Sequence, residues 1–141
     1  MLMELVVDAN VLFSFFKSES TVRDIIIDPE SKFGLMLYAP ELMLSELDKH
    51  KSEICVKARI SEEGYELSRN VLETFVKSMP NEFWQDCKED ASKLLPEHPK
   101  DTPYFALALK LGCAIWSNEK KLKWQSVVKI FSTKELLELF K

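Results

Sequence analysis

Short runs of consecutive apolar residues, separated by stretches with helical spacing, constrain the fold of this chain more than any other feature. The first run, Leu5-Val6-Val7, is continuous and β-branched, as expected of a strand buried on both faces. Similar runs predict strands at residues 35–39, 113–116 and 127–131. Because strands that alternate with helices form right-handed βαβ units, the sequence predicts an α/β fold: a three-layer sandwich around a parallel sheet.

The segments between the strands show helical spacing and recognisable helix ends. Helices are expected around residues 22–26, from Pro40-Glu41, over residues 62–78 and 81–95, from Asp101 to Gly112, and from Ser132-Thr133 to Leu139. The middle of the chain has the pattern of helix only, which predicts a helical insertion in the sandwich. Because no repeat or Gly/Ser-rich linker interrupts the pattern, residues 1–141 are expected to form one domain.

Composition and charge exclude several classes of protein. No apolar run approaches the roughly 20 residues that a membrane-spanning helix needs, and the first residues have no basic leader typical of a signal peptide. The three cysteines are far apart and odd in number, which argues against a disulfide framework or a zinc site and favours a reducing cytoplasm. The net charge of −4 speaks against a nucleic-acid partner, although a nuclease that binds metal ions must carry its own acids.

Four acidic residues are expected at one edge of the predicted sheet. Asp8 comes directly after the first strand, and Glu119 comes shortly after the strand at residues 113–116. The carboxyl ends of parallel strands share one edge, where ligands bind in open α/β sheets. Glu46 lies on the helix that follows the second strand, beside an apolar stripe, and Asp101 begins a later helix. The sequence therefore predicts that four carboxylates from four segments converge.

Each acid alone also has an ordinary structural explanation. Asp8 and Asp101 are plausible helix caps, Glu46 a plausible surface residue of a helix, and Glu119 a plausible partner of a helix dipole. These separate roles do not explain why all four positions fall on the same edge. The metal-binding interpretation accounts for the set as a whole.

Carboxylates that lie close together repel one another unless cations neutralise them. An all-oxygen set of ligands suits Mg²⁺ or Mn²⁺, and the two histidines, His50 and His98, are not spaced as zinc ligands. Such ions promote hydrolysis of phosphodiesters by activating water and by stabilising the leaving oxygen. With three glycines the chain has neither a GxGxxG motif nor a P-loop, which argues against a nucleotide cofactor. It has no GxSxG motif, which argues against a serine hydrolase.

Four short motifs resemble those of the PIN-domain (PilT N-terminus) family. The segment Val6-Val7-Asp8-Ala9-Asn10-Val11-Leu12 is similar to the opening of PIN domains, an apolar strand followed by Asp, a small residue and Asn. The later motifs are Ser45-Glu46-Leu47, Asp101-Thr102-Pro103-Tyr104-Phe105-Ala106-Leu107-Ala108-Leu109 and Ser117-Asn118-Glu119-Lys120-Lys121-Leu122. They occur in the order and with the spacing of the family, over essentially the full chain.

This resemblance implies a Rossmann-like sheet, Mg²⁺ or Mn²⁺ as cofactor, and endonucleolytic cleavage of RNA. The catalytic, metal-binding acids would be Asp8, Glu46, Asp101 and Glu119. Asn10 and Ser117 match positions that support the metal ligands by hydrogen bonds. Two residues depart from the family pattern: Glu119 replaces the usual Asp, and Lys121 stands where a further acid is common. Lys121 would either weaken a second metal site or contact a substrate phosphate.

Several alternatives remain open at this level. A PIN-like module with an impaired site would act in RNA binding or as a protein scaffold. An active enzyme would be either a toxin, with an antitoxin protein as its partner, or an RNA-processing nuclease. Family members often form homodimers, for which Phe75, Phe83 and Trp84 are candidate contacts, although aromatic residues of this kind belong to the core more often.

Overall fold

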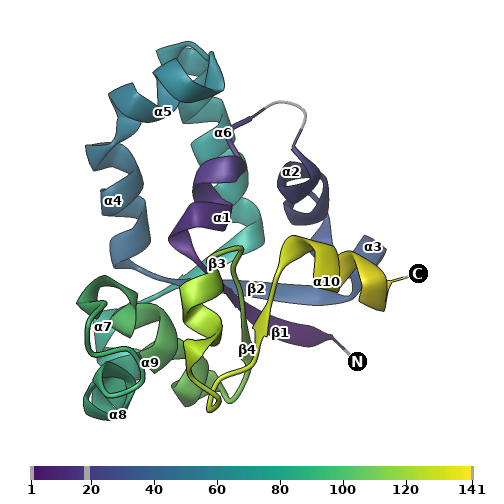
Figure 1. Ribbon diagram of the computed structural model, residues 1–141. Helices are drawn as coiled ribbons and strands as arrows, with labels where there is room; N and C mark the ends of the chain where they lie inside the picture. The colour runs from purple at the N-terminus through teal and green to yellow at the C-terminus, as the bar shows by residue number, and fades with distance from the viewer. Residues whose placement is uncertain (1, 18–19, 141) are drawn as a thin grey trace.

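The structure is a computed structural model that describes residues 2–17 and 20–140 (Figure 1). Five strands form one sheet: β1 (Met3–Val7), β2 (Leu35–Pro40), β3 (Val76–Met79), β4 (Ala114–Trp116) and β5 (Ile130–Phe131). Their spatial order is β3-β2-β1-β4-β5, and every neighbouring pair is parallel. The predicted α/β fold with a parallel sheet is therefore confirmed.

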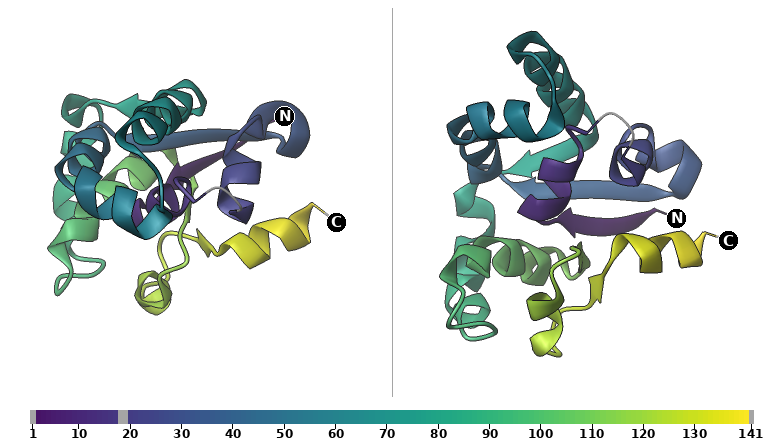
Figure 2. Two further views of the ribbon diagram at one scale, coloured as in Figure 1. Left: turned by 90° about the horizontal axis from the view of Figure 1, so that it is seen from above. Right: turned by 45° about the horizontal axis from the view of Figure 1, so that its top comes forward.

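Helices cover both faces of the sheet (Figures 1 and 2). One face is covered by α1 (Ala9–Ser14), α2 (Thr21–Ile26), α4 (Leu42–Lys49), α5 (Lys51–Ala58), α6 (Glu62–Phe75) and α10 (Thr133–Leu139). The other is covered by α7 (Asn81–Trp84), α8 (Lys88–Ser92) and α9 (Thr102–Leu111). The remaining short helices are α3 (Pro29–Phe33), η1 (Gln85–Cys87), η2 (Pro99–Asp101) and η3 (Lys120–Trp124). The three-layer arrangement is thus confirmed.

The apolar runs of the strands fill two hydrophobic clusters, one on each face. In β1, Leu5 and Val7 belong to the cluster under α1, whereas Val6 belongs to the cluster under α9. In β4, Trp116 belongs to the cluster under α1 and Ile115 belongs to the cluster under α9. Successive side chains of a strand point to opposite faces, so a strand buried on both sides must be apolar at every position. This requirement explains why the runs are continuous.

The connection from β3 to β4 brings Asp8 and Ser117 together. The chain passes from β3, at one edge of the sheet, to β4, which lies on the other side of β1. Val7 pairs with Trp116 in the register of β1 and β4, and the Asp8 backbone N–H donates to the Trp116 carbonyl oxygen at 3.0 Å. This point of reversed strand order is where open α/β sheets bind ligands. Both termini lie on the opposite side of the molecule (Figure 1).

Two predictions about the strands were wrong. The middle of the chain is not helix only, because α6 ends at Phe75 and β3 follows as an edge strand beside β2. The predicted strand at residues 127–131 is reduced to Ile130–Phe131, and the exposed Val127 lies in the preceding loop. Edge strands tolerate polar residues such as Lys77. The sequence of β3 therefore resembles the end of a helix, and the strand was not predicted.

The helix ends were predicted more accurately than the helix lengths. Gly112 ends α9 in the left-handed conformation, and Ser132 forms a capping box with Glu135 at the start of α10. Pro40, however, belongs to β2, and the stretch 81–95 is broken into α7, η1 and α8. The aromatic residues proposed as contacts pack inward instead: Trp84 is buried, and Phe75 and Phe83 are half-buried against the two clusters.

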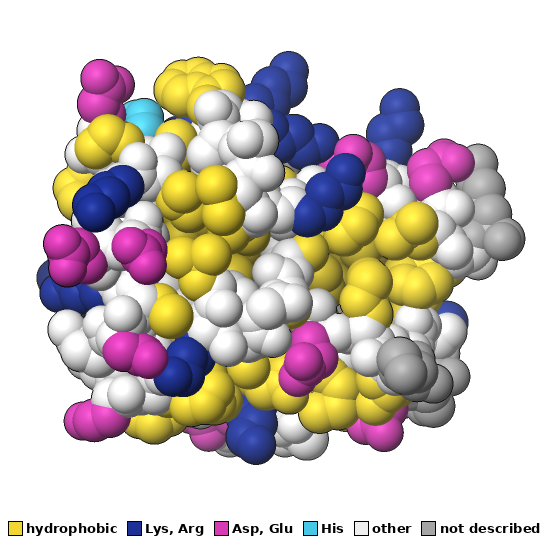
Figure 3. Space-filling model, turned by 90° about the horizontal axis from the view of Figure 1, so that it is seen from below, with side chains coloured by type: hydrophobic (Ala, Val, Ile, Leu, Met, Phe, Trp, Pro, Cys, Tyr) yellow, Lys and Arg dark blue, Asp and Glu magenta, His cyan; other side chains and the backbone are white. Residues whose placement is uncertain are grey.

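One face of the molecule carries side chains of mixed type. The underside of the molecule (Figure 3) shows hydrophobic, acidic and basic side chains next to one another, and no single sign of charge dominates this face. Within residues 2–17 and 20–140, no helix has both the length and the apolar character to cross a bilayer.

Candidate functional site

A pocket of about 510 Å³ opens at the carboxyl edge of the sheet and contains all four predicted acids. Its lining comprises Asp8, Ala9, Asn10, Phe13, Leu42, Glu46, Lys49, Lys100, Asp101, Pro103, Tyr104, Glu119 and Lys121. These residues come from the ends of β1 and β4, from α1 and α4, and from the start of α9. The structure thus gathers six of the seven predicted site residues around one cavity. The seventh, Ser117, lies behind Asp8 and contacts it.

Asp8 is the most deeply buried of the four acids, with 3% of its surface exposed. Its Oδ2 atom accepts a hydrogen bond of 2.7 Å from the Ser117 hydroxyl. Burial raises the pKa of Asp8 to about 6, against the lowering effect of the hydrogen bonds from Ser117 and from the Ala9 backbone; the negative charges of Asp101 and Glu119 raise it further. Asp8 caps α1 only through its backbone, because no side-chain cap hydrogen bond is present.

Asp101 faces a lysine across the pocket. Its Oδ2 atom lies 3.6 Å from Lys121 Nζ, an ion-pair distance that is longer than a hydrogen bond. Burial raises the pKa of Asp101, and the positive charge of Lys121 acts in the opposite direction. Asp101 is the N-cap residue of α9, but its carboxylate makes no cap hydrogen bond to the backbone of the helix. Lys121, one of the two departures from the expected motif, is therefore a direct partner of a predicted site acid.

Glu46 and Glu119 lie nearer to solvent. The side chain of Glu46 is 49% exposed, although its neighbours Met43 and Leu47 on α4 are buried. The expectation placed Glu46 beside Leu42 and Met43, away from the solvated face of the helix; Met43 is buried, but Leu42 is half-buried and Glu46 itself is exposed. Glu119 is exposed on the loop after β4, and its backbone N–H donates to the Ser117 hydroxyl at 3.1 Å. Ser117 thus connects the backbone of one site acid to the carboxylate of another.

The donor atoms of the pocket are of the kind that binds a divalent cation, although they lie too far apart to surround one. Asn10 Oδ1 and Asp101 Oδ2 are both buried and have no hydrogen-bond partner among the described residues. Oxygen donors of this kind are the ligands that Mg²⁺ and Mn²⁺ prefer. In the described part of the chain, no three His, Cys, Asp or Glu side chains are placed closely enough to hold one ion. Among the described residues, the four carboxylates thus line one pocket without converging on a single point, and Asp101 is paired with Lys121.

Sequence reasoning missed three polar residues of the pocket: Tyr104, Lys49 and Lys100. Tyr104 is buried on α9, three residues after Asp101, and this spacing places both on the same side of the helix. Burial and the charges of Asp8, Glu46 and Asp101 raise its pKa. Tyr104 lies one helical turn from Asp101, and Lys49 lies one helical turn from Glu46. This spacing was the signal that would have identified these two residues.

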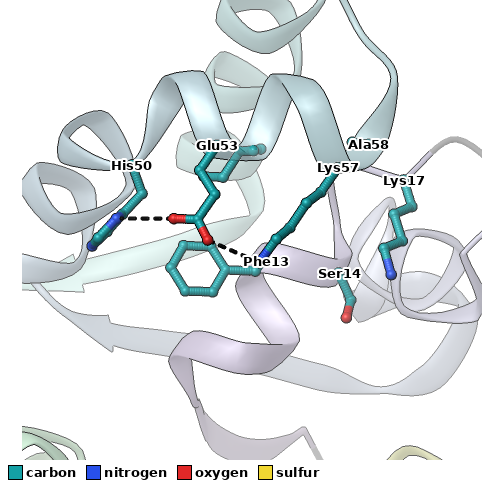
Figure 4. A pocket seen from close by; sticks show the side chains of 8 residues that line it. Phe13, Ser14, Lys17, His50, Glu53, Lys57 and Ala58 are labelled. Atoms are coloured by element: carbon teal, nitrogen blue, oxygen red, sulfur yellow. Dashed lines mark hydrogen bonds and ion pairs between the residues drawn. The ribbon is translucent and has the colours of Figure 1, made fainter.

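A second cavity of about 370 Å³ adjoins the first, because Phe13 lines both. Its lining also includes Ser14, Lys17, His50, Glu53, Ile54, Lys57 and Ala58. Figure 4 shows the Glu53 carboxylate between His50 and Lys57, to which it is joined at 3.4 and 2.8 Å. His50 also lies 3.9 Å from Glu46, so the polar groups of the two cavities are in contact.

The sequence was also compared with known proteins. A family model described as PIN domain matches residues 6–139. No curated protein gives a match to the sequence. The matched segment includes all seven predicted site residues.

Proposed function

Because this chain belongs to the PIN-domain family, whose members are generally nucleases that use divalent metal ions, we propose that it is a metal-dependent endoribonuclease. The observation that carries the proposal is the pocket at the carboxyl edge of the sheet. Four carboxylates from four separate segments line it, together with three lysines. Acids that bind cations and lysines that bind phosphates are the two kinds of group that phosphodiester hydrolysis requires.

We assign Asp8, Glu46, Asp101 and Glu119 to metal binding, with Asn10 as an additional oxygen donor. A Mg²⁺ or Mn²⁺ ion held by these residues would activate a water and would stabilise negative charge on the phosphate. Asp8, whose pKa is raised to about 6, is ionised at neutral pH and is held in place by Ser117. Asn10 Oδ1 has no hydrogen-bond partner among the described residues, and Asp101 Oδ2 has none beyond its ion pair with Lys121, so these two buried oxygens are candidate ligands of a cation.

The cationic and phenolic groups of the pocket act on the RNA. Lys49, Lys100 and Lys121 line the cavity and would neutralise the phosphates on either side of the bond that is cut. Tyr104, whose pKa is raised by burial, carries a protonated phenol at neutral pH as any tyrosine does, and its hydroxyl can donate a hydrogen bond to a phosphate oxygen. Lys121 is paired with Asp101 in the structure, and it would be available to a substrate phosphate if a cation were bound by that carboxylate.

Circular single-stranded RNA tests the proposed activity, because only an endonuclease can open it. The protein should convert the circle to linear RNA and then to fragments in Mn²⁺ or Mg²⁺, and EDTA should stop the reaction. A DNA circle of the same sequence should remain intact. A circle that stays closed in either metal would contradict the proposal, and equal cleavage of the DNA circle would contradict its specificity for RNA.

A second candidate function has one observation in its favour. The ion pair between Lys121 and Asp101 occupies a predicted metal ligand, which is what an impaired site would show. Such a module would bind RNA or act as a protein scaffold without cutting. Isothermal calorimetry separates the two candidates, because a scaffold should bind no Mn²⁺ at millimolar concentration.

We also propose a domain organisation, a cellular compartment and a partner for this enzyme. Both hydrophobic clusters share one sheet, so we treat residues 1–141 as one domain. Cys55, Cys87 and Cys113 are free thiols, which fits a reducing cytoplasm. A toxin with an antitoxin protein as its partner and an RNA-processing nuclease would share this site. A small reading frame directly upstream of the gene would favour the toxin.

A further inference from the structure

Trp124 is an aromatic residue outside the pocket with 70% of its surface exposed. The other two tryptophans, Trp84 and Trp116, are 3% and 0% exposed. An exposed indole leaves a large apolar surface in contact with water, which is unfavourable unless a partner covers it. Its position at the C-terminal end of η3, the helix that Glu119 precedes and that carries Lys121, places it in the same segment as the pocket.

The turn that carries Trp124 is held firmly by its neighbours. Leu122 and Val128 are buried in the cluster under α9 and anchor the segment at both ends. Between them, the Gln125 side chain donates to the carbonyl oxygens of Leu122 and Val128 at 2.9 and 2.8 Å. The Gln125 side-chain oxygen also accepts from the backbone N–H groups of Val127 and Val128. The exposed indole is therefore presented on a fixed loop rather than on a flexible one.

A chain of contacts joins Trp124 to the acids of the pocket. Its ring lies 6.0 Å, centroid to centroid, from the ring of His98, which is half-buried. The His98 carbonyl oxygen accepts a hydrogen bond of 3.1 Å from the Asp101 backbone N–H. Lys100, two residues after His98, lines the pocket. The aromatic pair thus stands beside a lysine of the pocket and a predicted metal ligand.

We propose that Trp124, backed by His98, is the stacking platform for an unpaired base of the RNA, next to the phosphodiester held in the pocket. Bases of single-stranded RNA stack on aromatic side chains, whereas the bases of a duplex are not accessible to them. The platform therefore selects single-stranded RNA over duplex RNA. This inference rests on the proposed ribonuclease function and adds to it the side chain that binds the base.

The fluorescence of the protein itself reports the stacking, because Trp124 is its one exposed tryptophan. An unlabelled ten-nucleotide oligoadenylate, added in Ca²⁺ after a gel has shown that it stays intact, should quench the emission of the wild-type protein. A duplex containing the same strand should quench much less. Trp124→Phe should remove the quenching while retaining most of the affinity, measured by anisotropy of a dye-labelled oligomer, because phenylalanine also stacks.

Trp124→Ala should weaken binding of the single strand by roughly 5- to 100-fold and leave duplex binding unchanged. Val127→Ala is the matched control, because Val127 is 66% exposed in the same turn and has no ring to stack; its affinity should equal that of the wild type. Circular dichroism of each variant verifies that the fold is retained.

Three outcomes would overturn the inference. Unchanged affinity of Trp124→Ala, in a protein that does bind and cut RNA, would refute the platform and leave the ribonuclease function intact. If Trp124→Ala instead abolished self-association in sedimentation without altering RNA affinity, the indole would belong to a protein interface. A wild-type protein that neither binds the oligomer nor cuts it in Mn²⁺ would refute the platform and the ribonuclease function together.

Discussion

The hydroxyl of Ser117 donates a hydrogen bond of 2.7 Å to Oδ2 of Asp8, although 109 positions separate the two residues in the sequence. The parallel pairing of β1 and β4 makes this contact possible, because both strands end at the same level of the sheet. Hydrogen bonds to an ionised carboxylate are among the strongest in proteins. Ser117 therefore keeps a buried acid ionisable at neutral pH and fixes the direction in which it faces the pocket.

Ser117→Ala should raise the pKa of Asp8 above its present value of about 6, because one of the hydrogen bonds that lower it is lost. A ¹³C NMR titration of the Asp8 carboxyl measures this change. Ser132→Ala is the matched control: it should cost about 1 kcal/mol of stability through loss of the α10 cap and leave the Asp8 pKa unchanged. An unchanged Asp8 pKa in Ser117→Ala would show that the hydrogen bond does not tune the acid.

The stability of the metal-free protein should depend on the ionisation of Asp8. Its pKa is raised from 3.8 when unfolded to about 6 when folded, so the folded state retains a proton that the unfolded state releases. The contribution of Asp8 to the free energy of unfolding should therefore be greatest below pH 4, fall by roughly 3 kcal/mol as the pH rises to about 6, and then level off. Asp8→Asn cannot titrate, so urea unfolding should show a smaller fall in this variant. Parallel curves for the two proteins would contradict the raised pKa.

The sequence was most informative where a strand is buried on both faces. Leu5-Val6-Val7 must be continuously apolar, so this strand and the acid after it were predicted in nearly their right places. The edge strand β3 was missed because Lys77 and Ser78 need not be buried there, and an alternating pattern of four residues resembles the end of a helix.

The candidate site was likewise predictable only in part. The ends of β1 and β4 meet because parallel topology requires it, so the convergence of Asp8 and Glu119 on one pocket follows from their positions after strands. The ion pair of Lys121 with Asp101 and the exposure of Trp124 depend on how one turn of η3 packs, and no periodicity of the sequence encodes that. Tyr104 was overlooked because a tyrosine in an apolar helix has the pattern of a core residue.

Lys121→Ala should separate the two roles of this lysine. Loss of the nearby positive charge should raise the pKa of Asp101 further and weaken binding of single-stranded RNA, with a salt-dependence slope smaller by about 0.7. Lys121→Asp should instead increase Mn²⁺ affinity, because it adds an oxygen ligand. Lys88→Ala, an exposed lysine on α8 outside the pocket, should behave as the wild type in both measurements. If both Lys121 variants matched the wild type, as the Lys88→Ala control should, Lys121 would have no part in the site.

Mn²⁺ should stabilise the folded protein by binding to the pocket acids. At a concentration a hundredfold above the dissociation constant, the expected gain is about 2.7 kcal/mol, which corresponds to a rise in Tm of several degrees. Asp8→Asn should lose most of this rise, whereas Asp90→Asn, which changes an exposed acid on α8, should keep it. An equal rise in both variants would place the bound metal elsewhere.

The most direct test of the central claim is the rate at which Asp8→Asn cleaves single-stranded RNA in Mn²⁺, compared with the wild type. The variant keeps the size of the side chain and an oxygen that can accept from Ser117, but it lacks the negative charge needed to bind the ion. The account predicts that the wild type cuts internally, that EDTA abolishes cutting, and that the variant is slower by at least about a hundredfold. Cleavage by Asp8→Asn at the wild-type rate would contradict the assignment of this pocket as the active site.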